Sequence, residues 1–117
     1  MHELALARGI LAAALAHAGG RPVRRIDLTV GALRQVVPDS LAFNFALVAQ
    51  GTPCEGARLE QHLEPARVRC PCGEAWELRE PSFRCPRCGS SETAVIGGED
   101  LLVEAIEVEE DPCTASG

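Results

Sequence analysis

The chain has 117 residues, of which 46% are apolar and 3% aromatic. That length suits one domain with a small appendage, built around aliphatic rather than aromatic side chains. The formal net charge of −6 argues against a phosphate-backbone partner, and no apolar stretch reaches the roughly 20 residues that span a bilayer. We therefore expect neither a nucleic acid nor a membrane among its partners.

Residues 3–18 are predicted to form a helix that stops at Gly19-Gly20. Its apolar positions at helical spacing are Leu4, Ala7, Ile10, Leu11, Ala14, Leu15 and Ala18. The same stretch has a second interpretation, as a secretory leader ending in a small-x-small pattern. Its start contains Glu3 and a single cation, Arg8, whereas secretory leaders begin with a positively charged region. We therefore expect a cytoplasmic protein, in which thiols stay reduced.

A strand and a second helix are predicted next along the chain. The strand prediction for 23–33 rests on alternation, with Ile26, Leu28 and Val30 on one face and Arg25, Asp27 and Thr29 on the other. A helix is predicted to begin at Pro38, because proline is tolerated in a first turn, and Asp39 adds favourable negative charge there. Its apolar residues Leu41, Phe45 and Val48 keep helical spacing up to Gly51.

Two further strands complete the predicted sheet. Residues 57–66 alternate, with Leu59 and Leu63 expected to point inward, and residues 100–109 form the last strand. The sequence thus predicts an α/β (α+β) fold, a small two-layer unit of a three-stranded sheet and two helices. A zinc-ribbon-like insert interrupts it before the last strand. The expected division is 1–67 with 98–110 as one domain, 68–97 as a second, and 111–117 as a disordered tail with a free thiol at Cys113.

Residues 68–97 contain four cysteines in two pairs, "CPCG" and "CPRCG", and little apolar sequence. A segment so short needs a cross-link to fold. Cys85 and Cys88 have the spacing of a metal knuckle, and Cys70 and Cys72 form a tighter pair, so the four together predict a tetrahedral thiolate site. Gly73 and Gly89 permit positive-φ turns after each pair, and a short hairpin within about 76–84 would bring the pairs together.

Several alternatives to a four-cysteine zinc site stay open. The thiols could form two disulfides, although the expected reducing compartment disfavours them. Cys54 or His62 could replace one ligand. Zinc suits four thiolates and would be structural, since no position is left for water, whereas iron in a rubredoxin-like cage is the chemical rival.

The ordered motifs of the chain resemble the HypA family of nickel chaperones. The motifs are the opening "MHEL", the stretch "VRRIDLTVGAL", the segment "VVPDSLAFNFALVAQGT" and the cysteines of "CPCG…CPRCGS". The resemblance runs from Met1 to about Val108. It implies a nickel domain built on the free N-terminus, a zinc domain before the last strand, a HypB-type GTPase partner, and delivery of nickel to a hydrogenase large subunit precursor.

The resemblance gives the opening residues a role. The amine of Met1, the amide nitrogen of His2 and the His2 imidazole can chelate one Ni²⁺ in adjacent rings, and Glu3 can add an oxygen ligand or orient the site. Some relatives contribute an acidic residue at the start of the second helix. That position falls here on Pro38, so Asp39 is expected to complement the helix start rather than to bind nickel.

Two other functional classes are alternatives to a nickel chaperone. A zinc-ribbon module that binds proteins or nucleic acids would need a basic face, but arginines and glutamates are mixed over 68–97. A rubredoxin-like electron carrier would be coloured. No catalytic triad or phosphate loop is present, and we expect no enzyme. His17 and His62 are interpreted as a helix-end cation and a surface strand residue.

Overall fold

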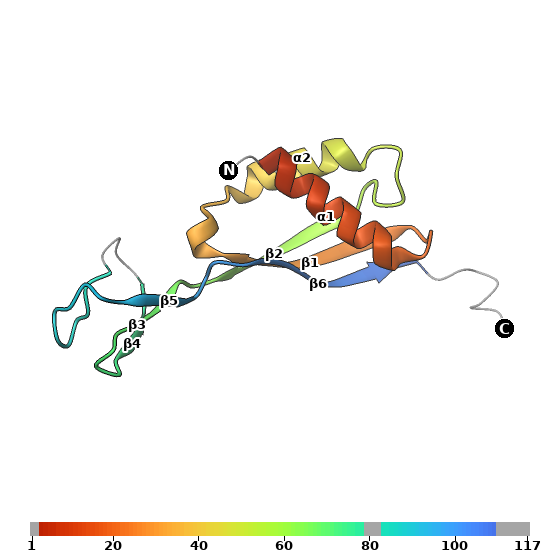
Figure 1. Ribbon diagram of the computed structural model, residues 1–117. Coiled ribbons are helices and arrows are strands. Elements are labelled where there is room, and N and C mark those ends of the chain that lie inside the picture. The colour runs from red at the N-terminus through yellow and green to blue at the C-terminus, as the bar shows by residue number, and fades with distance from the viewer. Residues whose placement is uncertain (1–2, 79–82, 110–117) are drawn as a thin grey trace.

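The protein, described by a computed structural model over residues 3–78 and 83–109, contains two α-helices and two three-stranded sheets (Figure 1). A short 3₁₀ helix, Ala32–Arg34, takes up the end of the segment predicted as a strand over 23–33. The two α-helices are α1 (Glu3–Ala18) and α2 (Pro38–Ala49). The first sheet has the order β2–β1–β6, from β1 (Val23–Gly31), β2 (Arg58–Glu64) and β6 (Leu101–Val108). The second has the order β4–β3–β5, from β3 (Arg67–Arg69), β4 (Ala75–Glu77) and β5 (Ala94–Gly97). The predicted α+β fold, with a cysteine-bearing insert before the last strand, is confirmed.

Helix α1 packs its predicted apolar stripe against the first sheet. Ala7, Ile10, Ala14 and Ala18 are its buried residues. The helix ends where Gly19 takes a positive φ of 62°, a conformation that glycine adopts at no steric cost. The apolar stretch considered as a secretory leader is therefore the core-facing side of a helix. None of the helices in the described ranges is long and apolar enough to cross a membrane.

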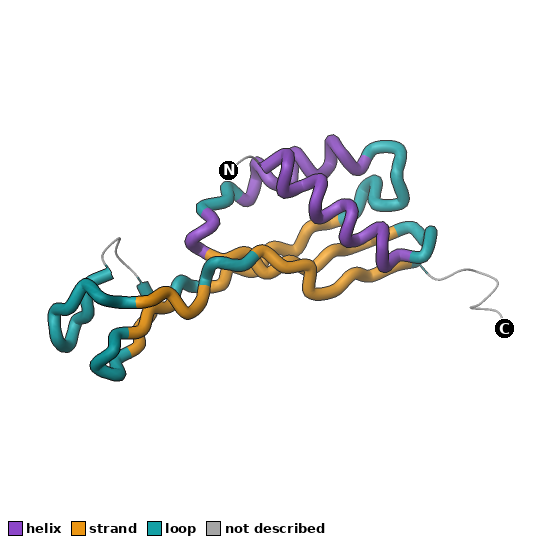
Figure 2. Tube along the Cα trace, viewed as in Figure 1, coloured by secondary structure: helices purple, strands orange, loops and turns teal. Residues whose placement is uncertain are grey.

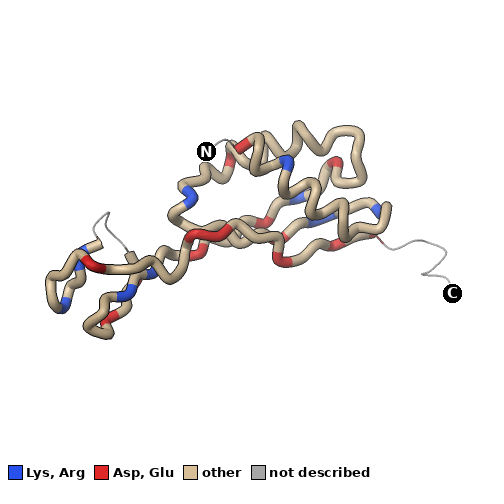
Figure 3. Tube along the Cα trace, in the orientation of Figure 1, with Lys and Arg blue, Asp and Glu red and all other residues tan. Residues whose placement is uncertain are grey.

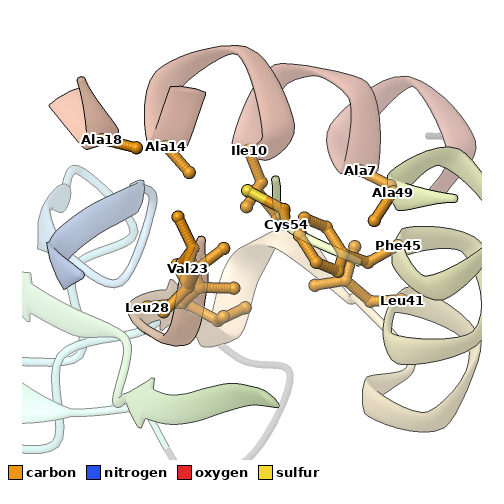
Figure 4. Packing of buried hydrophobic residues seen from close by; sticks show 12 residues of the cluster. Ala7, Ile10, Ala14, Ala18, Val23, Leu28, Leu41, Phe45, Ala49 and Cys54 are labelled. Atoms are coloured by element: carbon orange, nitrogen blue, oxygen red, sulfur yellow. The ribbon is translucent and has the colours of Figure 1, made fainter. Parts of the chain in front are cut away.

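Helix α2 begins at Pro38 in its first turn, as predicted, with Asp39 beside it. Leu41, Phe45 and Ala49 are its buried residues, and together with α1 and β1 they form one apolar layer (Figure 4). Both helices lie on the same face of the first sheet (Figures 1 and 2). Burial of this layer provides the main stabilisation of the first sheet.

Strand β1 is the centre of that sheet, parallel to β2 and antiparallel to β6. The predicted alternation is confirmed, since Ile26, Leu28 and Val30 are buried. The prediction for Leu63 is wrong: this side chain is 71% exposed. Gln61 lies on the same face of β2 as Leu63, and its Nε2 donates to the Pro38 carbonyl at 3.0 Å. Helix α2 therefore begins above Gln61, and it does not extend over Leu63.

The second sheet is smaller and lies beyond the end of the first, away from the helices (Figure 2). Its central residue Val68 is fully buried, opposite Trp76 on β4. The hairpin predicted within 76–84 falls partly on 79–82, outside the described residues. The hairpin that the structure describes joins β3 to β4 instead, with its turn at the first cysteine pair.

The two sheets meet at a close contact between Gly98 and Ala66. A Cβ at Gly98 would lie 2.5 Å from the Ala66 Cα, and Gly98 has a φ of 87°, so only glycine fits. The Glu64 carboxylate accepts a hydrogen bond from the Gly98 N–H at 2.9 Å. The resulting molecule is elongated, with a radius of gyration of 18.4 Å against about 13 Å for a compact chain of about 100 residues.

Candidate metal centre

The first cysteine pair lies in the turn between β3 and β4. The Cys70 N–H donates to the Glu74 carbonyl at 2.8 Å, and the Gly73 N–H donates to the Cys70 carbonyl at 2.9 Å. Gly73 takes a φ of 99°, as predicted from its position after the pair. This turn allows a Cys-x-Cys pair to present both thiols on one side, which the short spacing alone left uncertain.

The second pair forms a tight loop of the type found in metal knuckles. The Gly89 N–H donates to the Cys85 carbonyl at 2.9 Å, and Gly89 has a φ of 77°. The N–H groups of Arg87 and Cys88 both point at the Cys85 sulfur, at 3.4 Å. Such donors stabilise a thiolate, because they place partial positive charge beside it.

The two loops bring all four sulfurs together. The Cys70 and Cys88 Sγ atoms are 3.5 Å apart, those of Cys72 and Cys85 are 3.7 Å apart, and all four lie within 4.8 Å of one another. A regular tetrahedron with metal–sulfur bonds of about 2.3 Å has edges of about 3.8 Å. The arrangement therefore has the size of a four-thiolate metal site, and the four cysteines are free thiols rather than disulfides.

The four sulfurs differ in exposure and in proton affinity. Cys70 and Cys85 are buried, whereas Cys72 and Cys88 are exposed. Burial raises the pKa of Cys85, but the N–H donors of Cys88 and Arg87 and two neighbouring thiols together lower that pKa to about 7. At Cys70 a backbone hydrogen bond from Cys72 lowers the pKa, yet burial and the neighbouring thiols raise it to about 12. Of the two buried thiols, Cys85 is therefore the one that loses its proton more readily at neutral pH.

The alternative ligands lie elsewhere. Cys54 is fully buried in the core of the first sheet, where burial raises its pKa. His62 lies on the open face of the first sheet, with Nε2 3.8 Å from the Asp27 carboxylate. Within the described ranges, the four insert cysteines are the one group of three or more side chains placed to share an ion. Cys113 lies outside the described residues.

The predicted nickel ligands are only partly visible. Met1 and His2 lie outside the described residues, and Glu3 is the half-buried first residue of α1. Asp39 is exposed in the first turn of α2, the place expected for a residue that complements the helix start. His17 lies in the last turn of α1, as predicted.

Two features near the metal centre were missed in the sequence. The first is Val68, the fully buried central residue of β3, two residues before Cys70. The second is the contact of Gly98 with Ala66. A glycine pair, Gly97-Gly98, was the available signal, but nothing in the sequence says which backbone approaches it.

Comparison with known proteins agrees over nearly the whole chain. A family model described as "Hydrogenase/urease nickel incorporation, metallochaperone, hypA" matches residues 1–108. The chain is 42% identical over 113 residues to the hydrogenase maturation factor HypA of Acidithiobacillus ferrooxidans, covering 93% of this chain and 100% of that protein. It is 39% identical to HypA of Rippkaea orientalis, with 94% and 97% covered.

Solved structures agree at the level of the fold. The solution structure of the nickel metallochaperone HypA from Helicobacter pylori superposes with a TM-score of 0.69 at 17% identity, covering 95% of this chain and 100% of that one. A second HypA protein solved in solution gives a TM-score of 0.70, also at 17% identity, with 93% and 97% covered. By its sequence, this chain belongs to the HypA family of metallochaperones for nickel incorporation into hydrogenase.

Proposed function

We propose that this protein binds Ni²⁺ at its N-terminus and delivers it during maturation of a nickel–iron hydrogenase in the cytoplasm. The observation that carries the proposal is the family match, which begins at residue 1 and so includes the opening "MHE". A HypB-type GTPase and a hydrogenase large subunit precursor are the partners we propose. The protein is then a carrier of its metal and not a catalyst.

The proposed nickel ligands are three nitrogens of the first two residues. They are the Met1 amine, the His2 amide nitrogen and the His2 imidazole, with Glu3 as an oxygen ligand or an orienting group. Nitrogen donors in adjacent chelate rings suit the square-planar or tetragonal geometry of Ni²⁺. Glu3 is the first residue of α1, so its backbone belongs to the helix and it follows His2 directly in the sequence.

Zinc is the metal that we propose for Cys70, Cys72, Cys85 and Cys88. The sulfur spacing fits a tetrahedral ion, and four thiolates leave no position for water, so the site is structural. Zinc would tie the β3–β4 turn to the Cys85–Gly89 loop. On this proposal residues 68–97 form a zinc-binding domain, and 1–67 with 98–110 form a nickel-binding domain.

Metal analysis of untagged protein, with and without added nickel, tests the proposal. We expect close to one tightly held zinc per chain and a separate, exchangeable nickel. His2→Ala should abolish nickel binding and leave zinc in place, because it removes a chelate ring. His62→Ala is the matched control, an exposed histidine on β2 that should leave both metals unchanged.

Three outcomes would contradict the proposal. If His2→Ala binds nickel with wild-type affinity, the N-terminal nickel site is excluded. A coloured protein with iron in place of zinc would favour an electron carrier. Zinc without any nickel binding would favour an interaction module, the remaining alternative.

A further inference from the structure

A groove runs between α1 and β6, away from the cysteines. Its first part has a volume of about 370 Å³ and is lined mainly by apolar residues of the two elements, with Arg34 at one end. A second hollow of about 290 Å³ continues it along β6 and shares His17 and Val103 with the first. The groove therefore follows most of the length of the strand.

The floor of the groove is a sheet edge. In the part of the chain that the structure describes, β6 pairs with β1 alone, so its outer edge has unpaired backbone N–H and C=O groups. The strand is eight residues long, and its pairing with β1 is irregular opposite Val23–Arg25 and Asp27–Leu28. Figure 1 shows it at the edge of the sheet below α1. An open edge is a template on which another strand can add.

Small residues line much of the helical wall of the groove. Ala5, Gly9 and Ala13 recur every four residues along it. Gly9 stands in the middle of α1 and no atom lies within 4 Å of where its Cβ would be. Glycine within a helix destabilises it, and no contact within the described protein requires glycine there. Its effect is to leave space for a second backbone to approach α1 closely.

The charges beside this edge select the partner. Glu104 and Glu107 are exposed on β6, which contains no basic residue, and Figure 3 shows acidic and no basic positions along it. The Glu107 carboxylate lies 3.9 Å from the Arg25 guanidinium of β1, so Glu104 is the carboxylate of β6 for which the structure gives no cation partner. Arg34 lies at one end of the groove, where its Nε donates to the Glu99 carbonyl at 2.8 Å, just before β6 begins. His17 lies where the two hollows meet. A second copy would bring the same acidic strand against this one, which like charges oppose.

We propose that the α1–β6 groove binds an extended segment of a partner protein in which apolar and basic residues alternate. The segment adds to the free edge of β6. Its apolar side chains enter the groove beneath Gly9, and its basic side chains face Glu104 and Glu107 on the open side. The groove contains none of the four cysteines, and its helical wall begins at Ala5, two residues after the proposed nickel ligand Glu3.

The test uses the zinc-loaded full-length protein and two synthetic octapeptides, capped at both ends. One alternates valine with lysine, and the other alternates valine with glutamate. We expect the valine–lysine peptide to shift the backbone amide NMR signals of β6 and of α1 around Gly9. The valine–glutamate peptide should bind about tenfold more weakly, since each cross-strand charge pair changes the free energy by up to about 1 kcal/mol.

Two variants locate the site. Gly9→Leu fills the helical wall of the groove and should abolish binding of the valine–lysine peptide. Ala12→Leu is its control, an exposed position on α1 outside the groove that should leave binding unchanged. Glu104→Lys should reverse the preference between the two peptides without altering the fold, because its side chain is exposed.

The proposal is overturned if the valine–lysine peptide leaves the β6 signals unmoved, if both peptides bind equally, or if Gly9→Leu binds as the wild type does. Signals of β6 that shift with protein concentration alone would identify a second copy as the occupant, and would equally overturn it.

Discussion

The two sheets of this protein have the same number of strands but are stabilised in different ways. The first is covered by two helices and shares twelve buried residues with them, from Ala7 to Cys54. No helix covers the second sheet in the part of the chain that the structure describes, and the buried hydrophobic residues found there are Ala66, Val68, Cys70 and Cys85. Half of these are proposed metal ligands. A sheet that cannot bury enough apolar area needs a cross-link. The first sheet is stabilised by apolar burial under its helices, and the second depends on its cysteine cluster.

Removing the second cysteine pair should produce the largest effect. With Cys85→Ser and Cys88→Ser together, we expect zinc to be lost and the second sheet to unfold, because structural zinc binding contributes about 10–16 kcal/mol in small domains. Fluorescence of Trp76 should report the loss, while the helical circular dichroism of the first region persists. Cooperative unfolding of the whole chain would show that the two regions are not independent.

Shortening the central side chain of the first core is the converse change. Phe45→Ala should destabilise the helix-covered sheet by about 3–5 kcal/mol, because Phe45 is 1% exposed and truncation leaves a cavity. Denaturant unfolding followed by circular dichroism measures this, and metal analysis should find zinc retained. Phe43→Ala, on the outer face of the same helix at 70% exposure, should change stability by less than about 0.5 kcal/mol.

The junction tests whether the two regions constrain each other. Gly98→Ala should destabilise the protein by about 1–3 kcal/mol, because it adds a methyl group to a close backbone contact. Gly56→Ala is the control: Gly56 also has a positive φ, of 79°, but nothing lies within 4 Å of its added Cβ. Equal losses in the two variants would mean that backbone strain alone matters and that the contact with Ala66 does not.

The smallest expected effect concerns pH. The lowered pKa of Cys85, about 7, means that protons compete with a metal at this thiol only as the pH falls below about 7. An ordinary thiol would face that competition from its usual pKa of 9.0 downward. If the cysteine loops keep their fold without zinc, zinc affinity titrated with a chelator depends on pH with a slope one proton smaller between 7 and 9 than below 7. A constant slope across this range is the result expected if the loops unfold with zinc removal, because the N–H donors that lower the Cys85 pKa are then lost.

Local sequence patterns determined most of the elements. The apolar spacing in α1, the start of α2 at Pro38 and the alternation in β1 each reflect one short stretch of chain, so each could be predicted without knowledge of its neighbours. The cysteine spacing likewise predicted a four-sulfur cluster, because few residues separate the members of each pair. The nickel site at the opening residues remains a prediction, since Met1 and His2 lie outside the described residues.

Contacts between distant segments were decided only by the tertiary structure. Leu63 alternates correctly, yet it is exposed because α2 begins too far along the sheet to cover it. Cys54 could be a ligand on residue type alone, and only packing places it in the first core. The approach of Gly98 to Ala66 and the open edge of β6 depend on which strands become neighbours. A sequence pattern records what each residue prefers, whereas the position of a partner far along the chain is determined by how the whole core packs.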